Sequence, residues 1–306
     1  MNNANLINMQ FLMFACIFCG LLARKLGYIT TSSRKNMTDL ILMIFLPCNL
    51  FGSFLGELTP DFLKASIQIF LASCMFQVIT ILGGRFLFKN AREDRRNIYQ
   101  YSTIVSNAGF LGSPVCESLY GQTGVMYGSI YLIPLRICMW SFGLSCFTKI
   151  DKKNIVFKTA THPCMVAVYL GLIVMFCQFH LPAMITGAIS SLGRCTTPMS
   201  MMMIGSLLAE IKWKELLDPI LLLFSIFRLV ILPAIILVLC MSLKLDPMVT
   251  AISTVLVGMP AGNTTALLAA KYDGDAHFAS KIVTVSTLLS LVTISMWYTI
   301  LQMVLH

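Results

Sequence analysis

Long, nearly uninterrupted apolar runs separated by short polar segments dominate the pattern of this chain. Ten such runs lie at residues 6–23, 37–56, 62–84, 99–118, 122–147, 160–178, 184–208, 218–242, 249–270 and 277–303. A helix needs about 20 apolar residues to cross the hydrocarbon core of a bilayer. Strands of a membrane barrel would instead alternate apolar and polar positions over about ten residues. The pattern therefore predicts an all-α membrane protein with ten transmembrane helices.

Composition excludes several classes of protein. Of the 306 residues, 57% are hydrophobic and only 11% are charged, whereas soluble domains carry roughly 25% charged residues. Too few charges remain to cover a water-exposed surface, which excludes a soluble enzyme with an anchor, a secreted disulfide scaffold and a disordered protein. The net charge of +9 would suggest a nucleic-acid partner in a soluble protein, but in a membrane protein its location decides its meaning.

The basic residues are distributed unevenly among the predicted loops. Sixteen of the 22 Lys and Arg residues lie in the odd-numbered loops, whereas the even-numbered loops and their edges hold only Lys64 and Lys244. Since positive loops stay in the cytoplasm, the odd loops are expected inside and both termini outside the cell. We interpret these charges as orientation signals of a multi-pass protein of the plasma or inner membrane, so no nucleic-acid partner is expected.

The two halves of the chain resemble each other. Residues 101–105 (YSTIV) match residues 252–256 (ISTVL) at a shift of 151, and Pro47 precedes Pro198 by the same shift. We therefore divide the chain into repeats 1–156 and 157–306, each with five spans. Because five is odd, the second repeat would enter the membrane inverted relative to the first, a recurrent plan of secondary transporters with a midplane substrate site.

Glycine and proline cluster in the middle of the fourth span of each repeat. Proline lacks an N–H and clashes with the preceding helical turn, so both spans are expected to break at these clusters. In lipid, the released backbone groups must be satisfied by protein, water or ligand. The candidate substrate-binding residues at the two breaks are Asn107, Gly112, Ser113 and Pro114 in the first repeat and Pro260, Gly262 and Asn263 in the second.

Local chemistry suggests how each break is organised. Ser113 followed by Pro114 has the form of a helix cap with proline in the first turn, and Asn263 could cap the second half of its span. Two half-helices would then point the positive ends of their dipoles at the midplane. Such ends, together with the amide groups of Asn107 and Asn263, predict an anion site; the alternative is a pair of kinks that only aid helix packing.

The same segments resemble a known family. Residues 107–114 (NAGFLGSP), residues 259–263 (MPAGN) with 269–272 (AAKY), and the tail 279–291 are similar to the crossover motifs and last helix of the auxin efflux carrier (PIN-like) family. The resemblance covers the whole chain in span count and is most specific in the two crossovers. The long cytoplasmic loop of many plant members is absent, so the chain resembles a compact bacterial-type member.

This resemblance implies a fold and a mechanism. Helices 1, 2, 6 and 7 would form a scaffold domain, and helices 3–5 and 8–10 a transport domain that moves like an elevator against it. By motif match, Asn107 would contact the substrate carboxylate, with Asn263 as a second asparagine. Relatives are associated with small carboxylates such as malate or malonate, so auxin itself is a doubtful substrate. The resemblance also suggests a homodimer formed through the scaffold domain.

Five of the charged residues inside the predicted spans are candidates for a functional role. Arg136, Arg194 and Arg228 are each about ten residues from both ends of their spans, which at 1.5 Å per residue is near the midplane. Such arginines must face protein or water, and we expect Arg136 and Arg228 to attract an anionic substrate. A purely structural pairing of each arginine is the alternative. Glu117 and Asp39 are candidates for a coupling proton or cation.

These observations together predict a secondary transporter of small organic anions embedded in the lipid bilayer. The alternatives are a cation-coupled symporter or antiporter of the same broad fold, and a membrane sensor that binds a ligand without moving it. No enzymatic activity or cofactor is expected, because the sequence lacks the motifs of ATP hydrolysis and zinc proteolysis. All eleven cysteines lie in apolar spans without a matching set of histidines, so no metal site is expected.

Overall fold

The computed structural model describes residues 3–55, 60–147, 161, 163–179, 181–209, 218–272 and 274–305. All of its regular elements within these residues are helices, apart from one isolated antiparallel bridge. The prediction of an all-helical protein is therefore confirmed. The expected boundary between the repeats, at residues 156 and 157, lies outside the described residues, as do all the basic residues of the fifth and seventh predicted loops.

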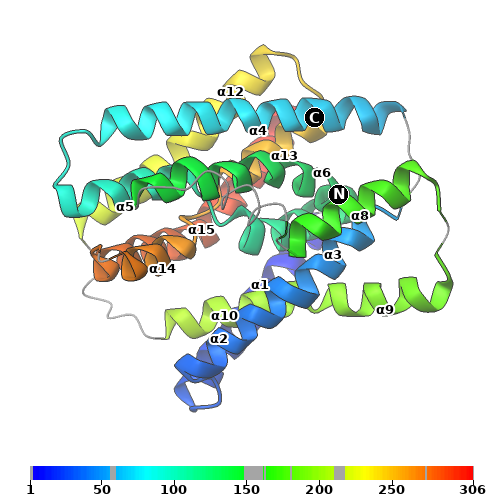
Figure 1. Ribbon diagram of the computed structural model, residues 1–306, viewed down its shortest axis with the longest axis horizontal. Coiled ribbons are helices and arrows are strands. Elements are labelled where there is room, and N and C mark those ends of the chain that lie inside the picture. The colour runs from blue at the N-terminus through cyan, green and yellow to red at the C-terminus, as the bar shows by residue number, and fades with distance from the viewer. Residues whose placement is uncertain are drawn as a thin grey trace. The chain divides into compact units, whose positions relative to one another are not determined.

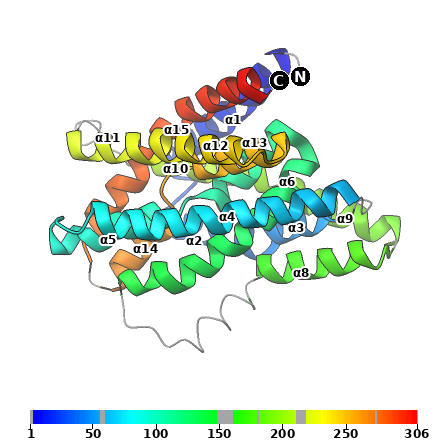
Figure 2. The ribbon, with the colours of Figure 1, turned by 90° about the horizontal axis from the view of Figure 1, so that it is seen from above.

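The chain divides into two compact units, each built from separate stretches of sequence. Unit 1 comprises Met1–Pro60, Ser113–Ser129 and Thr161–Ile211, and unit 2 comprises Asp61–Gly112, Ile130–Ala160 and Lys212–His306. Figures 1 and 2 identify the helices of both units by label and colour.

Unit 1 holds the helices from the beginning of each half of the chain. They are α1 (Asn3–Lys25), α2 (Thr31–Leu40), η1 (Ile41–Phe45), α3 (Leu46–Ser53), α8 (Pro163–Phe176), α9 (Ala183–Arg194) and α10 (Thr196–Leu208), with the start of α6 (Ser113–Cys138). Helices α1 and α10 lie side by side. A Cβ atom added to Gly20 would meet the backbone of Met202, and one added to Gly205 would meet the backbone of Ile17. Small residues thus let these two helices approach closely, as is common in membranes.

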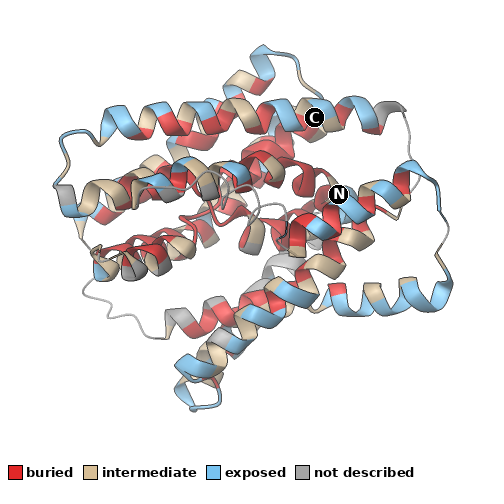
Figure 3. Ribbon diagram, viewed as in Figure 1, coloured by how far each residue is buried: buried red, intermediate tan, exposed pale blue. Residues whose placement is uncertain are grey.

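Unit 2 holds the remaining helices. They are α4 (Pro60–Leu87), α5 (Glu93–Ile104), η2 (Ala108–Gly112), the end of α6, η3 (Met139–Gly143), η4 (Leu144–Cys146), α11 (Pro219–Ile226), η6 (Phe227–Ile231), α12 (Leu232–Ser242), α13 (Pro247–Val257), α14 (Thr264–Lys271) and α15 (Ala276–Leu305). Helices α12 and α13 lie side by side, as Figure 2 shows. Buried and exposed residues alternate along α4 in Figure 3, so α4 is buried on one face only, whereas every residue of α13 from Val249 to Val257 is buried.

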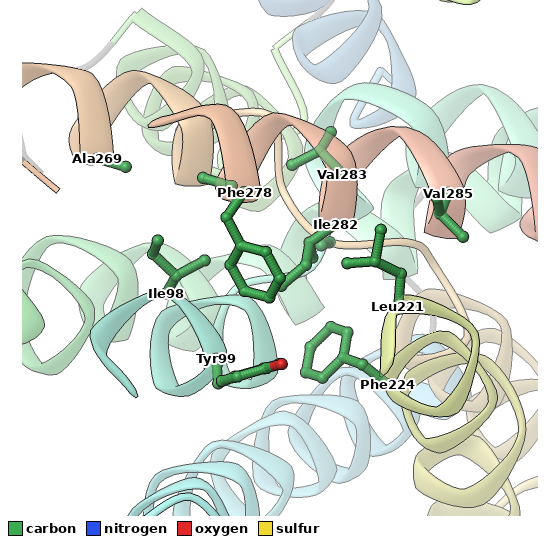
Figure 4. Packing of buried hydrophobic residues seen from close by; sticks show 11 residues of the cluster. Ile98, Tyr99, Leu221, Phe224, Ala269, Phe278, Ile282, Val283 and Val285 are labelled. Carbon is green, nitrogen blue, oxygen red and sulfur yellow. The ribbon is translucent and has the colours of Figure 1, made fainter. Parts of the chain in front are cut away.

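An aromatic cluster anchors the core of unit 2 (Figure 4). The ring of Tyr99 in α5 lies 5.5 Å from that of Phe224 in α11, in a tilted geometry. It lies 5.4 Å from the ring of Phe278 in α15, in an edge-on geometry. Such aromatic pairs contribute about 0.5–1.5 kcal/mol beyond the area that they bury. Ala261, which lies between α13 and α14, belongs to the same cluster. The packing therefore fixes the segment between these two helices.

Three helices contain a wide, π-helical turn directly before a proline. The turns η1, η2 and η6 each precede a helix whose second residue is proline, namely Pro47, Pro114 or Pro233. Proline cannot donate the backbone hydrogen bond that an α-helix requires, so the preceding turn widens. In α12, Pro233 leaves the carbonyl of Leu229 without its helical donor, and the indole N–H of Trp297 donates to that carbonyl instead at 2.7 Å.

The membrane spans agree with the sequence pattern in part. Among the described residues, five helical stretches are long and apolar enough to cross a bilayer: Thr31–Ser53, Phe62–Leu87, Ser113–Gly143, Pro219–Ser242 and Ala276–Leu305. Gly121, with φ 63° and ψ −152°, turns the chain sharply inside α6, between the predicted fourth and fifth spans. The predicted seventh span is divided at Cys195 into α9 and α10. The count of ten spans and the inverted repeat stay predictions.

Candidate functional site

Two chain segments that interrupt helices cross in unit 2. The first, residues 105–107, separates α5 from η2, and the second, residues 258–263, separates α13 from α14. The N–H of Asn107 donates to the carbonyl of Pro260 at 2.8 Å, and the N–H of Gly262 donates to the carbonyl of Val105 at 3.0 Å. Ser106 and Ala261 thereby form an isolated antiparallel bridge. We call this pair of segments the crossover; its two hydrogen bonds satisfy backbone groups that broken helices expose in lipid.

Glycines allow the close approach of the two segments. A Cβ atom on Gly262 would lie 3.1 Å from the side chain and 3.4 Å from the carbonyl of Val105. A Cβ atom on Gly112 would lie 2.7 Å from Leu256 and 3.1 Å from Met259. Both glycines were predicted from sequence as part of the site, and the structure places each of them against neighbouring residues that leave little room for a side chain. Their role is to let the crossover form.

Asn107 occupies the centre of the crossover. Its carbonyl accepts hydrogen bonds from Leu111 at 2.9 Å and Gly112 at 3.2 Å, which closes the wide turn η2. Only 5% of the residue is exposed, and the side-chain Nδ2 has no hydrogen-bond partner within the described part of the chain. An unpaired buried amide costs about 1–3 kcal/mol. The backbone of Asn107 is thus fully used, while its side-chain donor is available to a ligand.

The helix caps differ from the prediction. Ser113 is not a cap: it is the first residue of α6, and the preceding residue Gly112 is already helical and makes no side-chain capping bond. The reason is that the chain enters α6 directly from η2, so the break lies at residues 105–107, six residues or more before Ser113. Pro114 occupies the second helical position. Asn263 precedes α14 as predicted, but its side chain makes no capping hydrogen bond.

Four hydroxyl groups that sequence reasoning did not select are buried around the crossover or in the helices leading to it. Within the residues the structure covers, their oxygens have no hydrogen-bond partner; they belong to Ser102, Ser106, Ser253 and Thr265. Ser102 and Ser253 are equivalent in the internal repeat, being 151 residues apart. The repeat therefore carried a signal for these two positions. Because most buried polar groups are satisfied, such a group of hydroxyls requires an explanation.

Arg136 lies against the turn that follows Asn107. The residue is 8% exposed, and a Cβ atom on Gly109 would lie 3.7 Å from one of its terminal nitrogens. Among the described residues, no carboxylate lies within ion-pair distance of Arg136. The structure thus brings one predicted arginine beside the crossover, with its positive charge uncompensated.

Arg228 lies elsewhere in unit 2, in the wide turn η6. It is fully buried, and none of its three guanidinium nitrogens has a hydrogen-bond partner among the described residues. The guanidinium carbon lies 6.0 Å from the ring centre of Phe76, and the hydroxyl of Tyr131 is within range of an electrostatic interaction. Arg228 is therefore buried as predicted, in surroundings of aromatic groups.

Glu117 lies in unit 1, where three helices meet. Its Oε2 accepts hydrogen bonds from Nδ2 of Asn49 at 3.3 Å and from the hydroxyl of Thr197 at 3.1 Å. Asn49 also donates to the carbonyl of Gly193 at 3.3 Å. The half-buried carboxylate thus links α6 to α3 and α10, and Asn49 in turn links α3 to α9. Asn49 and Thr197 were not predicted from the sequence, since neither belongs to a recognisable motif.

Two further predicted charged residues are exposed. Arg194, which was expected near the midplane of the predicted seventh span, is exposed at the last turn of α9. It remains close enough to Glu117 for an electrostatic interaction. Asp39 is exposed in α2. In the described residues there is no group of three His, Cys, Asp or Glu side chains that could hold a metal ion.

Comparison with known proteins places this architecture in a family. The family model described as membrane transport protein matches residues 6–155 and 152–298. A transporter of uncharacterised function from Methanocaldococcus jannaschii is 23% identical over 293 residues, covering 92% of this chain and 94% of the relative. A second one, from Methanothermobacter thermautotrophicus, is 24% identical over 296 residues, covering 93% and 95%. With its crossover motifs and apolar helices, the chain belongs to the membrane transport protein family, the auxin efflux carrier-like transporters.

Proposed function

We propose that the protein is a secondary transporter of small organic anions, with the crossover as its substrate site. The observation that carries the proposal is the buried Nδ2 of Asn107, which has no partner among the described residues and lies in the segment that interrupts the helix. A buried amide donor is retained at a cost, and a ligand that accepts its hydrogen bond would offset that cost. Paired helix breaks are also the typical substrate site of secondary transporters.

The groups near Asn107 favour a carboxylate as the substrate. Arg136 brings a positive charge to the turn beside Gly109, and an arginine binds carboxylates with two parallel hydrogen bonds. The helix that starts at Ala108 adds the positive end of its dipole. The hydroxyls of Ser106 and Thr265 can donate or accept as the substrate requires. No acidic side chain of the described residues is bonded to this group. Together they suit a small mono- or dicarboxylate.

An elevator mechanism is supported by the division of the chain. Helices α4 and α5 and the segments from α11 to α15 fall in unit 2, whereas α1 to α3 and α8 to α10 fall in unit 1. The crossover lies wholly in unit 2. We propose that unit 2 carries the substrate and that unit 1 is the scaffold. Residues 113–129, which the family resemblance would assign to the transport domain, group with unit 1 instead.

Local hydrogen bonds support the inverted repeat. The hydroxyl of Thr103 donates to the carbonyl of Tyr99 at 2.8 Å, and the hydroxyl of Thr254 donates to that of Thr250 at 2.8 Å. These threonines are 151 residues apart and each follows a buried serine one position before it. Equivalent side chains thus make the same bond in the helix that leads into each half of the crossover.

Uptake into proteoliposomes tests the proposal. A panel of radiolabelled mono- and dicarboxylates is offered to the wild type, to Asn107→Ala and to Asn90→Ala, an exposed asparagine of unit 2. A hydrogen bond to a charged group contributes about 1.5–3 kcal/mol, so Asn107→Ala is expected to lower uptake at subsaturating substrate by about tenfold or more. Unchanged uptake by Asn107→Ala would refute the site. Ligand binding without any uptake would indicate a sensor instead.

Coupling to a cation gradient is a second candidate function, favoured by Glu117. A membrane-embedded carboxylate is a default candidate for ion or proton binding, and here two donors hold it in place. We propose that protonation of Glu117 releases the bonds to Asn49 and Thr197. Uptake driven by a pH gradient should then become independent of the gradient in Glu117→Gln, whereas Asp39→Asn should retain the dependence. Full gradient dependence in Glu117→Gln would exclude this role.

A further inference from the structure

A basic pocket lies at one end of α4 and α5 in unit 2. Its volume is about 350 Å³, and its lining includes Arg85, Lys89, Arg96, Asn97, Gln100 and Ser145. Three of these side chains are cationic and three are neutral donors. The distribution of basic residues predicts that this end of the two helices faces the cytoplasm. The pocket is separate from Asn107, Arg136 and Glu117, none of which lines it.

The cations of the pocket differ from their neighbours in having no acidic partner among the side chains that the structure describes. In the same loop region, Arg92 pairs with Asp94 at 3.0 Å and Arg95 lies 3.7 Å from Asp275. Within the described residues, no carboxylate lies within 4.0 Å of Arg85, Lys89 or Arg96. Orientation signals alone would explain basic residues at this end of the helices. A role as orientation signals does not explain why the three cations that line the pocket lack an acidic partner, whereas Arg92 and Arg95 each have one.

An apolar surface adjoins the pocket on α4. Leu82, Phe86 and Leu87 are exposed, at 62%, 71% and 55%, and they flank Arg85 along the last turns of the helix. The amine of Lys89 lies 5.2 Å from the ring centre of Phe86, so the charged and apolar groups are contiguous. A ligand that fits both would have a negative head and an apolar tail.

We propose that this pocket binds the phosphate of an anionic phospholipid headgroup, with the acyl chains against the exposed face of α4. Basic pockets between transmembrane helices on the cytoplasmic side are suited to anionic headgroups. Two arginines can each bind a phosphate with paired hydrogen bonds, while Lys89, Asn97 and Gln100 supply further donors. A soluble phosphate compound shares this chemistry but would make no contact with the apolar residues that adjoin Lys89 on α4.

Lipid titration of the purified full-length protein tests the proposal. Phosphatidylglycerol and phosphatidylcholine are added in detergent, and bound lipid is measured by native mass spectrometry alongside the melting temperature. The double variant Arg85→Gln/Arg96→Gln is compared with Arg92→Gln/Lys64→Gln, which removes the same charge outside the pocket. Near a membrane each basic side chain contributes on the order of a fivefold change in affinity. Phosphatidylglycerol should thus bind the pocket variant about 25-fold more weakly and the control variant almost as tightly as wild type.

Three results would overturn the proposal. Equal weakening in the two double variants would mean that charge acts diffusely, and equal binding of phosphatidylcholine would mean that the headgroup charge is not recognised. Inorganic phosphate and pyrophosphate form a separate arm. If either one displaces the lipid and reproduces the full thermal shift, the pocket is a site for a soluble anion. The single variant Lys89→Gln, expected to weaken binding about fivefold, keeps the test valid if the double variant fails to fold.

Discussion

Replacing Arg228 by methionine is expected to make the protein more stable, although the substitution removes a fully buried side chain. The guanidinium group is entirely inaccessible and unbonded among the described residues; the ring centre of Phe76 lies 6.0 Å away, and the hydroxyl of Tyr131 is within range of an electrostatic interaction. Removal of a hydrogen-bonded buried charge is normally destabilising, whereas an apolar replacement of an unsatisfied one is often stabilising. The sign of the effect therefore depends on what Arg228 contacts.

The magnitude follows from two opposing contributions. An arginine at the bilayer centre costs about 2.5–3.5 kcal/mol on insertion scales, and a desolvated cation–π contact returns up to about 2 kcal/mol. Methionine fills a similar volume and adapts to irregular space. The net expectation for Arg228→Met is a gain of about 1–2 kcal/mol, or a melting temperature higher by roughly 2–4 °C for a chain of this size.

Thermal unfolding in detergent, followed by intrinsic fluorescence, measures this effect. Arg92→Met is the matched control, because Arg92 is exposed and paired with Asp94, and surface ion pairs contribute only about 0–1 kcal/mol. A loss of more than about 1 kcal/mol in Arg228→Met would refute the reasoning, since it would mean that the native guanidinium has a bonded partner. If Arg228 also contacts the substrate, the stabilised variant should lose uptake.

Three further substitutions test other parts of the structure. Trp297→Phe should lower stability by about 1–3 kcal/mol, because it leaves the carbonyl of Leu229 without a donor. Gly262→Val should abolish uptake, because its side chain would push against Val105 and open the crossover. Gly20→Leu should destabilise unit 1 by at least about 1–3 kcal/mol, because α10 leaves no room for a side chain.

Each of these outcomes has a control. Trp297 can be compared with an exposed aromatic residue such as Phe86, whose replacement by leucine should leave the melting temperature nearly unchanged. Gly83, which has open space around its Cβ position, should tolerate valine better than Gly262 does. If Gly187→Leu, also at an open position, destabilised the protein as much as Gly20→Leu, helix propensity rather than close packing would be responsible.

The hydropathy of the sequence was enough to predict the fold class and most of the helix boundaries. Apolar runs of about 20 residues are long enough to span a bilayer, and the turn at Gly121 lies in the gap between two predicted spans. The sequence could not show where a span is divided without a polar gap. Cys195 lies in a continuous apolar run, so the boundary between α9 and α10 leaves no trace in hydropathy, and the exposure of Arg194 beside it could not be predicted.

The crossover was predicted in location but not in construction. Glycine and proline indicated the two breaks, yet the first break lies at residues 105–107, before the glycines. The reason is that Asn107 and Val105 form their hydrogen bonds with Pro260 and Gly262, which belong to the other half of the chain. A local sequence pattern cannot predict bonds between such distant residues. The partners of Glu117 were missed for the same reason, since Asn49 and Thr197 are 68 and 80 residues away from it in sequence.

The pairing of the crossover segments has a consequence for biogenesis. Asn107 and Val105 bond to residues that are synthesised about 150 residues later, which takes roughly 10–30 s at common rates of translation. Until then, the first half of the chain is in the membrane with unmatched backbone groups at its break. A half-length protein could complete this pairing only with a second copy of itself. Two complementary halves should therefore assemble when they are expressed together, and neither should be stable alone.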